Sequence, residues 1–277
     1  MAIVAQTSRF GSVSRPVLAW LVALLFFFPI FWMVLTSFKT DADAVKPEFL
    51  FFFTPTLENY LNMTENYDYW RFAINSVITS VFATLFTLFV GVPAAYAMAF
   101  NPTRRTKDIL MWMLSTKMLP AAGVLYPMTF LTKSMGLFDT HFLIIIVLSL
   151  INLPIVIWML YTYFKEIPKD IIEAGKMDGV NTWGEIKEIL VPLAWGGIAS
   201  TALLCFIFCW NEAYWTVRLT TTEAATLSKL IEGNRAPEGL FFGRLSAVSA
   251  AAVGPIVVLG WFCQKQLVQG LTFGAVK

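Results

Sequence analysis

The stretch PVLAWLVALLFFFPIFWMVLTSF, residues 16–38, contains no charged side chain and is long enough to cross a lipid bilayer. A membrane-spanning helix needs roughly 20 mostly apolar residues, because each residue adds about 1.5 Å along the helix axis. The stretch is longer than the roughly 7–15 residues of a signal-peptide core, and no small-residue cleavage site follows it. We therefore expect a retained transmembrane helix.

The rest of the chain has the same character. Of its 277 residues, 57% are hydrophobic and 14% are charged, whereas soluble domains carry about 25% charge. We predict an all-α integral membrane protein, with a transmembrane domain at 16–262 between tails at 1–15 and 263–277. The six predicted transmembrane helices are 16–38, 72–100, 109–132, 142–164, 193–217 and 245–262.

The distribution of basic residues predicts the orientation. If the N-terminus is cytoplasmic, the inner segments carry a modest excess of Lys and Arg, as membrane proteins generally do. The strongest contribution is the turn NPTRRTKD, residues 101–108. An even number of spans then places both termini in the cytoplasm. The two larger outer loops, 39–71 and 218–244, either pack at the membrane surface or contact a partner, and the sequence leaves both alternatives open.

The inner loop 165–192 has the pattern of two short helices. The first is predicted at Lys169 to Met177, and Gly179 fits a left-handed helix stop. Thr182 and Glu185 have the spacing of a capping box, which predicts the start of a second helix. So short a pair cannot bury a core of its own. It either rests on the membrane surface or docks on another protein.

The run EAGKMDGVNTWGEIKEILVP, residues 173–192, resembles the EAA motif of ABC-importer permease subunits. That motif is Glu-Ala-Ala, three residues, Gly, nine residues and Ile-x-Leu-Pro. Gly175 replaces the third alanine and Val191 replaces the leucine, and both changes keep small or apolar character. By this resemblance, the residues that couple the chain to an ATPase are Glu173, Ala174, Gly175, Gly179, Ile189 and Pro192.

Three other segments narrow the resemblance to one branch of these permeases. The end of the chain, residues 264–277, is similar to the tail of the maltose-type, carbohydrate-importing branch. STKMLP at 115–120 and FCWNEAYW at 208–215 look most like subunits that handle sugar alcohols or monosaccharides. The resemblance implies a subunit for a sugar or sugar alcohol.

The resemblance also implies the partners. The loop would provide a coupling helix that sits in a groove of a separate cytoplasmic ATPase dimer, and ATP binding there would drive alternating access. A second permease subunit would complete a heterodimer among the lipids of a bacterial inner membrane, and an extracytoplasmic binding protein would deliver the sugar. The chain itself has no phosphate-binding G-x-x-x-x-G-K-[ST] motif, so we expect the partner to use the ATP and this chain to hold no cofactor.

Ionisable residues inside spans are costly and are candidates for function. On this ground, together with the hydrogen-bonding and stacking needs of sugars, we predict that Lys117, Asn211, Glu212 and Tyr214 line the substrate pathway. Helix rise places Lys117 and Glu212 roughly 16 Å apart in depth. That gap favours separate positions along the pathway over a direct ion pair, unless Pro120 breaks its helix. The aromatic residues near Glu212 have the alternative role of an interfacial belt.

Other functions are weighed against this one. An ion-coupled secondary transporter would use a relay of intramembrane carboxylates or histidines, and the chain has one histidine. A membrane enzyme would need clustered catalytic groups, and none is evident, so we expect no catalytic site. The three cysteines lack metal-ligand spacing, and a net charge of +2 does not suggest nucleic-acid binding. An ABC permease for a non-carbohydrate solute remains the nearest alternative.

Overall fold

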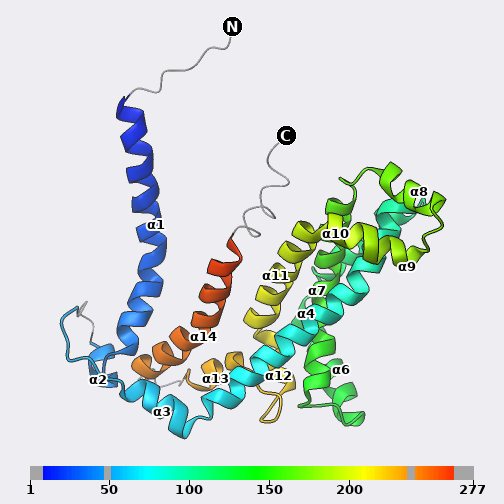
Figure 1. Ribbon diagram of the computed structural model, residues 1–277. Helices are drawn as coiled ribbons and strands as arrows, with labels where there is room; N and C mark the ends of the chain where they lie inside the picture. Colours follow the sequence, from blue (N-terminus) through cyan, green and yellow to red (C-terminus); the bar gives the residue numbers. More distant parts are fainter. Residues whose placement is uncertain (1–8, 47–50, 236–240, 265–277) are drawn as a thin grey trace. The chain divides into compact units, whose positions relative to one another are not determined.

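The computed structural model describes residues 9–46, 51–235 and 241–264, and every regular element in these ranges is a helix (Figure 1). The predicted all-α class is therefore confirmed. The predicted tails lie outside the described residues at 1–8 and from 265 onward. The helices are α1 (Arg9–Ser37), α2 (Asp41–Ala44), α3 (Glu58–Asn66), α4 (Tyr69–Phe100), α5 (Thr106–Thr116), α6 (Ala121–Ser134), α7 (His141–Phe164), α8 (Lys169–Met177), α9 (Thr182–Gly184), the π-helical η1 (Glu185–Leu190), α10 (Val191–Leu193), α11 (Trp195–Asn211), α12 (Tyr214–Leu219), α13 (Leu227–Gly233) and α14 (Phe242–Phe262).

The chain divides into two units. One comprises Met1–Asp68 with Gly233–Val253, and the other comprises Tyr69–Glu232 with Gly254–Lys277. In the described ranges, four single helices are long and apolar enough to cross a membrane: α1 from Arg15, α4, α7 and α14. Two further candidates are bent pairs, α5 with α6 and the α9–α10 segment with α11. Taking each pair as one span gives the six that the sequence predicts.

The predicted third span, 109–132, is wrong as a continuous helix. It is divided into α5 and α6, which meet at an angle of 84°. Pro120 has an extended conformation, with φ −65° and ψ 116°, and the residue before a proline is disfavoured in the helical conformation. The 11 residues of α5 reach only about half of the roughly 30 Å bilayer core.

The predicted fifth span, 193–217, also ends earlier than expected. Helix α11 stops at Asn211, and Glu212 is extended, with φ −69° and ψ 119°. The Glu212 carboxylate accepts the backbone N–H groups of Trp215 at 3.0 Å and Thr216 at 3.2 Å. This local hydrogen bonding starts the separate helix α12. An apolar pattern alone does not reveal it.

Close packing of α4 against α7 builds the core of the second unit. A Cβ added at Gly91 would lie 3.1 Å from a Val156 methyl group, and Ala83 is fully buried. The Ser149 hydroxyl donates to the Ala83 carbonyl at 3.2 Å. Small residues allow helix backbones to approach closely in a membrane, where the hydrophobic effect does not drive helices together.

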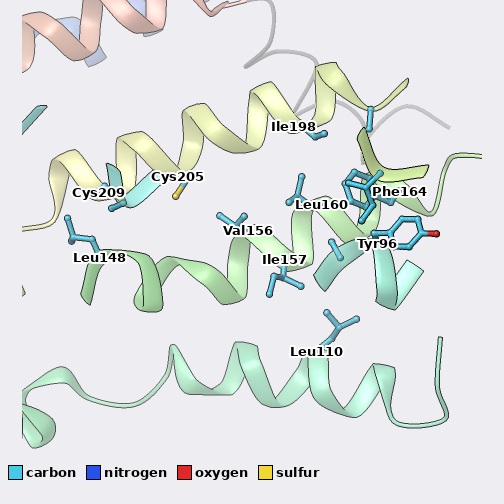
Figure 2. Packing of buried hydrophobic residues seen from close by; sticks show 14 of the residues in the cluster. Tyr96, Leu110, Leu148, Val156, Ile157, Leu160, Phe164, Ile198, Cys205 and Cys209 are labelled. Carbon is cyan, nitrogen blue, oxygen red and sulfur yellow. The ribbon is translucent and has the colours of Figure 1, made fainter. Parts of the chain in front are cut away.

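The buried apolar cluster extends along α4, α7 and α11 (Figure 2). Tyr96 and Phe164 lie at one end of it, and Leu148 and Cys209 lie at the other. Helices α8, α9 and α10 gather beyond the first end, whereas α12 follows the opposite end of α11 (Figure 1). The inner loop of the sequence analysis therefore packs on one end of the helix core.

The other unit contains the start of the first predicted outer loop. The Asn59 amide donates to the carbonyls of Ser37 at 3.0 Å and Lys39 at 2.7 Å, which joins α3 to the end of α1. Lys39 is 2% exposed, and its ammonium lies 4.2 Å from the Trp32 ring centroid and 5.3 Å from that of Phe53. Cation–π attraction accommodates the charge inside this packed structure.

Asp139 fastens the segment after α12 to the turn before α7. Its carboxylate accepts the backbone N–H groups of Thr221, Thr222, Glu223 and Ala224 at 2.9 to 3.2 Å. Burial raises the pKa of Asp139, but hydrogen bonds from the Thr221 hydroxyl and from these backbone groups outweigh it, and the net pKa lies below the ordinary value. The carboxylate is therefore held in its charged form.

Asp139→Asn removes one of the acceptor oxygens and the charge. We expect a local loss of about 2 kcal/mol, the scale of hydrogen bonds to a charged group. Amide hydrogen exchange of residues 220–226 at pH 7 should be at least tenfold faster than in the wild type. The exposed Asp178→Asn is the matched control. Because the folded pKa is depressed, the wild-type advantage should be complete above about pH 4 and vanish as the pH falls through the folded pKa. A difference that persists unchanged in acid would contradict this account.

Candidate functional site

The inner loop begins with helix α8, whose bounds match the predicted Lys169–Met177. Gly179 follows with φ +81°, so the predicted left-handed stop is confirmed. The Gly179 and Val180 N–H groups donate to the carbonyls of Lys176 and Gly175, both at 3.0 Å, and close the end of the helix. A Cβ at Gly179 would meet nothing within 4 Å. The turn needs glycine for its backbone conformation and not for close packing.

The second helix of the loop starts differently from the prediction. Asn181, rather than Thr182, is the capping residue, and its side-chain oxygen accepts the Gly184 N–H at 2.9 Å. Glu185 does not complete a capping box, because its carboxylate is buried and accepts the hydroxyl of Tyr96. The helix continues as the π-helical η1 and then α10, which includes Pro192.

Close packing between the two helices of the loop occurs at Gly175. A Cβ there would lie 2.4 Å from the terminal methyl of Ile189. The third motif position, where this chain departs from alanine, therefore faces the motif isoleucine directly. Gly175 is buried and Ile189 is half-buried, whereas the other motif residues are exposed. The exposed motif residues are Glu173, Ala174, Gly179 and Pro192.

Two large side chains that the sequence analysis missed stand on the open face of this loop. Met177 is 88% exposed and Trp183 is 63% exposed. Trp183 borders a hollow of about 540 Å³ that Gly179 and Lys187 also help to line. Large side chains on both sides of the glycine turn were the available signal. Such a surface suits contact with another protein.

The opposite end of α11 borders a second hollow, an open pocket of about 380 Å³. The break between α5 and α6 forms one wall, and the end of α11 with α12 forms another. The pocket brings together Lys117, Glu212 and Tyr214, three of the four predicted pathway residues. Its lining residues are Thr116, Lys117, Leu119, Ala121, Val124, Leu150, Ile151, Glu212, Tyr214 and Trp215.

The fourth predicted residue, Asn211, does not line the pocket. Its amide donates to the Ile207 carbonyl at 3.0 Å, and its side chain is exposed. Asn152 was missed, although its side-chain oxygen accepts the Lys117 ammonium at 3.4 Å. Asn152 is 2% exposed and donates to the Cys209 sulfur at 3.4 Å. A lone asparagine in an apolar helix was the signal available from the sequence.

Lys117 and Glu212 line the same pocket, and the ion pairs found among the described residues do not include one between them. The predicted depth of Lys117 assumed a continuous helix, which the break at Pro120 rules out. The described polar contact of Lys117 is with Asn152, and those of the Glu212 carboxylate are with backbone N–H groups. The residues that line the pocket thus include one with an ammonium, one with a carboxylate, a tyrosine and a tryptophan. Across the described ranges, no group of three or more metal-ligating side chains is found.

Comparison with known proteins identifies the family of this chain. The family model described as "Binding-protein-dependent transport system inner membrane component" matches residues 91–271. The chain belongs to this family. The permease is therefore a multi-pass inner-membrane transport subunit and not an enzyme, and the family acts with a separate ATPase and a binding protein.

Relatives extend over nearly the full length of the permease. The probable ABC transporter permease protein y4oR of Sinorhizobium fredii is 32% identical over 100% of both chains. The trehalose transport system permease protein SugB of Mycobacterium tuberculosis is 31% identical, covering 90% of this chain and 92% of the relative. The trehalose/maltose transport system permease protein MalG of Thermococcus litoralis is 31% identical, covering 93% and 94%.

A solved structure shows the same fold. It is the structure of a bacterial ABC transporter involved in the import of the acidic polysaccharide alginate. The alignment has a TM-score of 0.75 at 23% identity and covers 96% of the permease and 99% of the other chain.

Gly179→Ala tests the backbone requirement at the turn of the permease. Alanine must adopt a left-handed conformation there, which costs about 1–2 kcal/mol. We expect amide exchange within residues 169–193 to accelerate roughly tenfold. Gly123→Ala is the matched control, because a Cβ there also meets nothing within 4 Å and its φ lies outside the positive range. Equal exchange in the two variants would show that the turn does not depend on glycine.

Proposed function

We propose that this permease carries a small, neutral sugar or sugar alcohol, and that the loop at residues 165–192 transmits the ATPase cycle that drives transport. Relatives similar over at least nine-tenths of the chain are described as permeases for trehalose and for trehalose/maltose. These names support a carbohydrate substrate for an ATP-driven, binding-protein-dependent importer.

The chemistry of the pocket supports a neutral substrate. Lys117 and Glu212 place opposite charges on its walls, so the pocket does not select an ion of either sign. Sugar hydroxyls both donate and accept hydrogen bonds, which suits an ammonium beside a carboxylate, and the ring of Trp215 provides a flat apolar surface. A volume of about 380 Å³ falls at the small end of typical ligand pockets, roughly 300–1,000 Å³.

The relation between pocket and loop carries the proposal. They lie at opposite ends of α11, whose 17 residues span roughly 25 Å. The exposed motif residues, with Met177 and Trp183, would contact the ATPase dimer at one face of the membrane. The pocket would receive the sugar from an extracytoplasmic binding protein at the other. Both termini would then lie in the cytoplasm, as the excess of basic residues in the inner segments indicates, and a second permease subunit would share the pathway.

Reconstitution of the assembled transporter tests this function. The permease is purified in mild detergent with its co-purifying chains, which we expect to include a P-loop ATPase. Proteoliposomes are then supplied with the binding protein and with radiolabelled trehalose, maltose or sorbitol. Uptake should require ATP inside the vesicles and should survive proton and sodium ionophores. Uptake that needs an ion gradient and no ATP would favour a secondary transporter instead.

Two pocket variants test the substrate site. Lys117→Met removes a charge-assisted donor worth about 1.5–3 kcal/mol, so we expect a 10- to 100-fold higher KM for uptake. Glu212→Gln keeps one acceptor oxygen for α12 and should also impair uptake. Both variants should co-purify with the ATPase as the wild type does. The controls are Lys133→Met and Glu166→Gln, at exposed positions outside the pocket. Unchanged uptake by both pocket variants would remove the pocket from the pathway.

A further inference from the structure

A buried carboxylate joins three helical elements at the loop end of the core. Glu185 on η1 is 2% exposed, and its Oε2 accepts the hydroxyl of Tyr96 on α4, which is also 2% exposed. The ammonium of Lys176 on α8 lies 4.0 Å from the same oxygen. Figure 2 shows Tyr96 at the Phe164 end of the apolar cluster. Neither Glu185 nor Tyr96 is a residue of the recognised loop motif.

Packing alone does not call for a charged residue at this position. Apolar side chains already pack the loop against the core: Phe164, Ile172 and Leu190 are each at most 1% exposed. Desolvating a carboxylate is costly, and well-packed apolar residues often replace a buried ion pair without loss of stability. The carboxylate adds a directional contact. Its hydrogen bond to Tyr96 can form in only one position of η1 relative to α4.

The π-helical form of η1 is part of this arrangement. A π turn inside a helix is rare and is often found at functional sites. Here the turn begins at Glu185 and leaves Glu188, three residues later, exposed. The irregular turn therefore carries one carboxylate in the core and one on the surface.

Helix α4 also makes hydrogen bonds to another segment near its N-terminal end. Asn75 lies 21 residues earlier, roughly 32 Å along the helix, and its amide donates to the carbonyls of Glu223 at 2.8 Å and Ala225 at 2.9 Å. The Ser76 hydroxyl accepts the Leu227 N–H at 2.8 Å. One helix is thus hydrogen-bonded to the loop at one end and to residues 223–227 at the other.

We propose that Glu185 is a positioning residue that makes the loop and α4 move as one body, with Tyr96 as its partner, so that displacement of α8 reaches residues 219–227. Apolar contacts alone would let η1 slide over α4, whereas the hydrogen bond resists sliding. This inference rests on the proposed coupling role of the loop.

The test compares Glu185→Gln, Tyr96→Phe and the double variant in the complete reconstituted transporter. The controls are Glu188→Gln, an exposed carboxylate on the same π turn, and Tyr161→Phe on α7. Amide hydrogen exchange is measured without nucleotide and with ATP plus vanadate, which traps the ATPase dimer. Two regions are read separately: the loop at 169–193 and the far segment at 219–227.

In the wild type and the controls, nucleotide should change exchange in both regions. In the Glu185 and Tyr96 variants, we expect the loop to respond as in the wild type, while the response at 219–227 falls at least threefold. ATP-driven uptake should fall about tenfold, and the double variant should be no worse than either single variant.

Three results would overturn the proposal. A full response at 219–227 in Glu185→Gln and Tyr96→Phe would show that their hydrogen bond transmits nothing. Loss of the loop response in the same variants would show that Glu185 only stabilises the folded loop. Additive losses in the double variant would show that the two side chains act independently. Failure of the coupling role itself gives a different pattern, because the wild-type loop would then not respond to nucleotide.

Discussion

Inside a bilayer, each backbone N–H and C=O group needs a partner within the protein, because no water is present to replace it. The rest of this structure depends on that constraint. It makes the spans helical, and it allows a helix to break only where other groups bind the freed backbone. The pocket is built from two such breaks. At one break, Pro120 has no backbone N–H group that would need a partner. At the other, the Glu212 carboxylate accepts the N–H groups of Trp215 and Thr216.

The same constraint explains how much of the fold could be predicted. Apolar length identified the single helices, because a charge-free stretch such as residues 16–38 has few other stable environments. The break at Pro120 was foreseen only as an exception and the one at Glu212 not at all, since apolarity is averaged over many residues whereas a break depends on one or two. Pro120 was visible in the sequence, but prolines within the other predicted spans, such as Pro93 and Pro154, leave their helices continuous. Only tertiary packing distinguishes a proline that breaks its helix from one that does not.

The loop was predicted more closely than the pocket. Helix α8 and the glycine stop follow from local chemistry, which a sequence carries directly. The start of the second helix does not, because Asn181 and Thr182 are both good caps and the choice between them depends on Glu185. That carboxylate reaches Tyr96, 89 residues earlier in the chain, so no local pattern contains the contact. Lys117 and Glu212 were singled out for a simple reason: charge is expensive in a membrane, and both were conspicuous. That they line one pocket depends on the bend at Pro120, which the sequence analysis gave only as an exception.

The binding of Glu212 to its own backbone has a consequence for how this site can evolve. Its carboxylate is already engaged in starting α12, so a mutation that removes the acid also disturbs the wall of the pocket. On the opposite wall, the Lys117 side chain donates to the side chain of Asn152, and its described hydrogen bonds include none to the backbone. Substrate preference can therefore change by substitution of Lys117 at little cost to folding, while Glu212 stays unchanged.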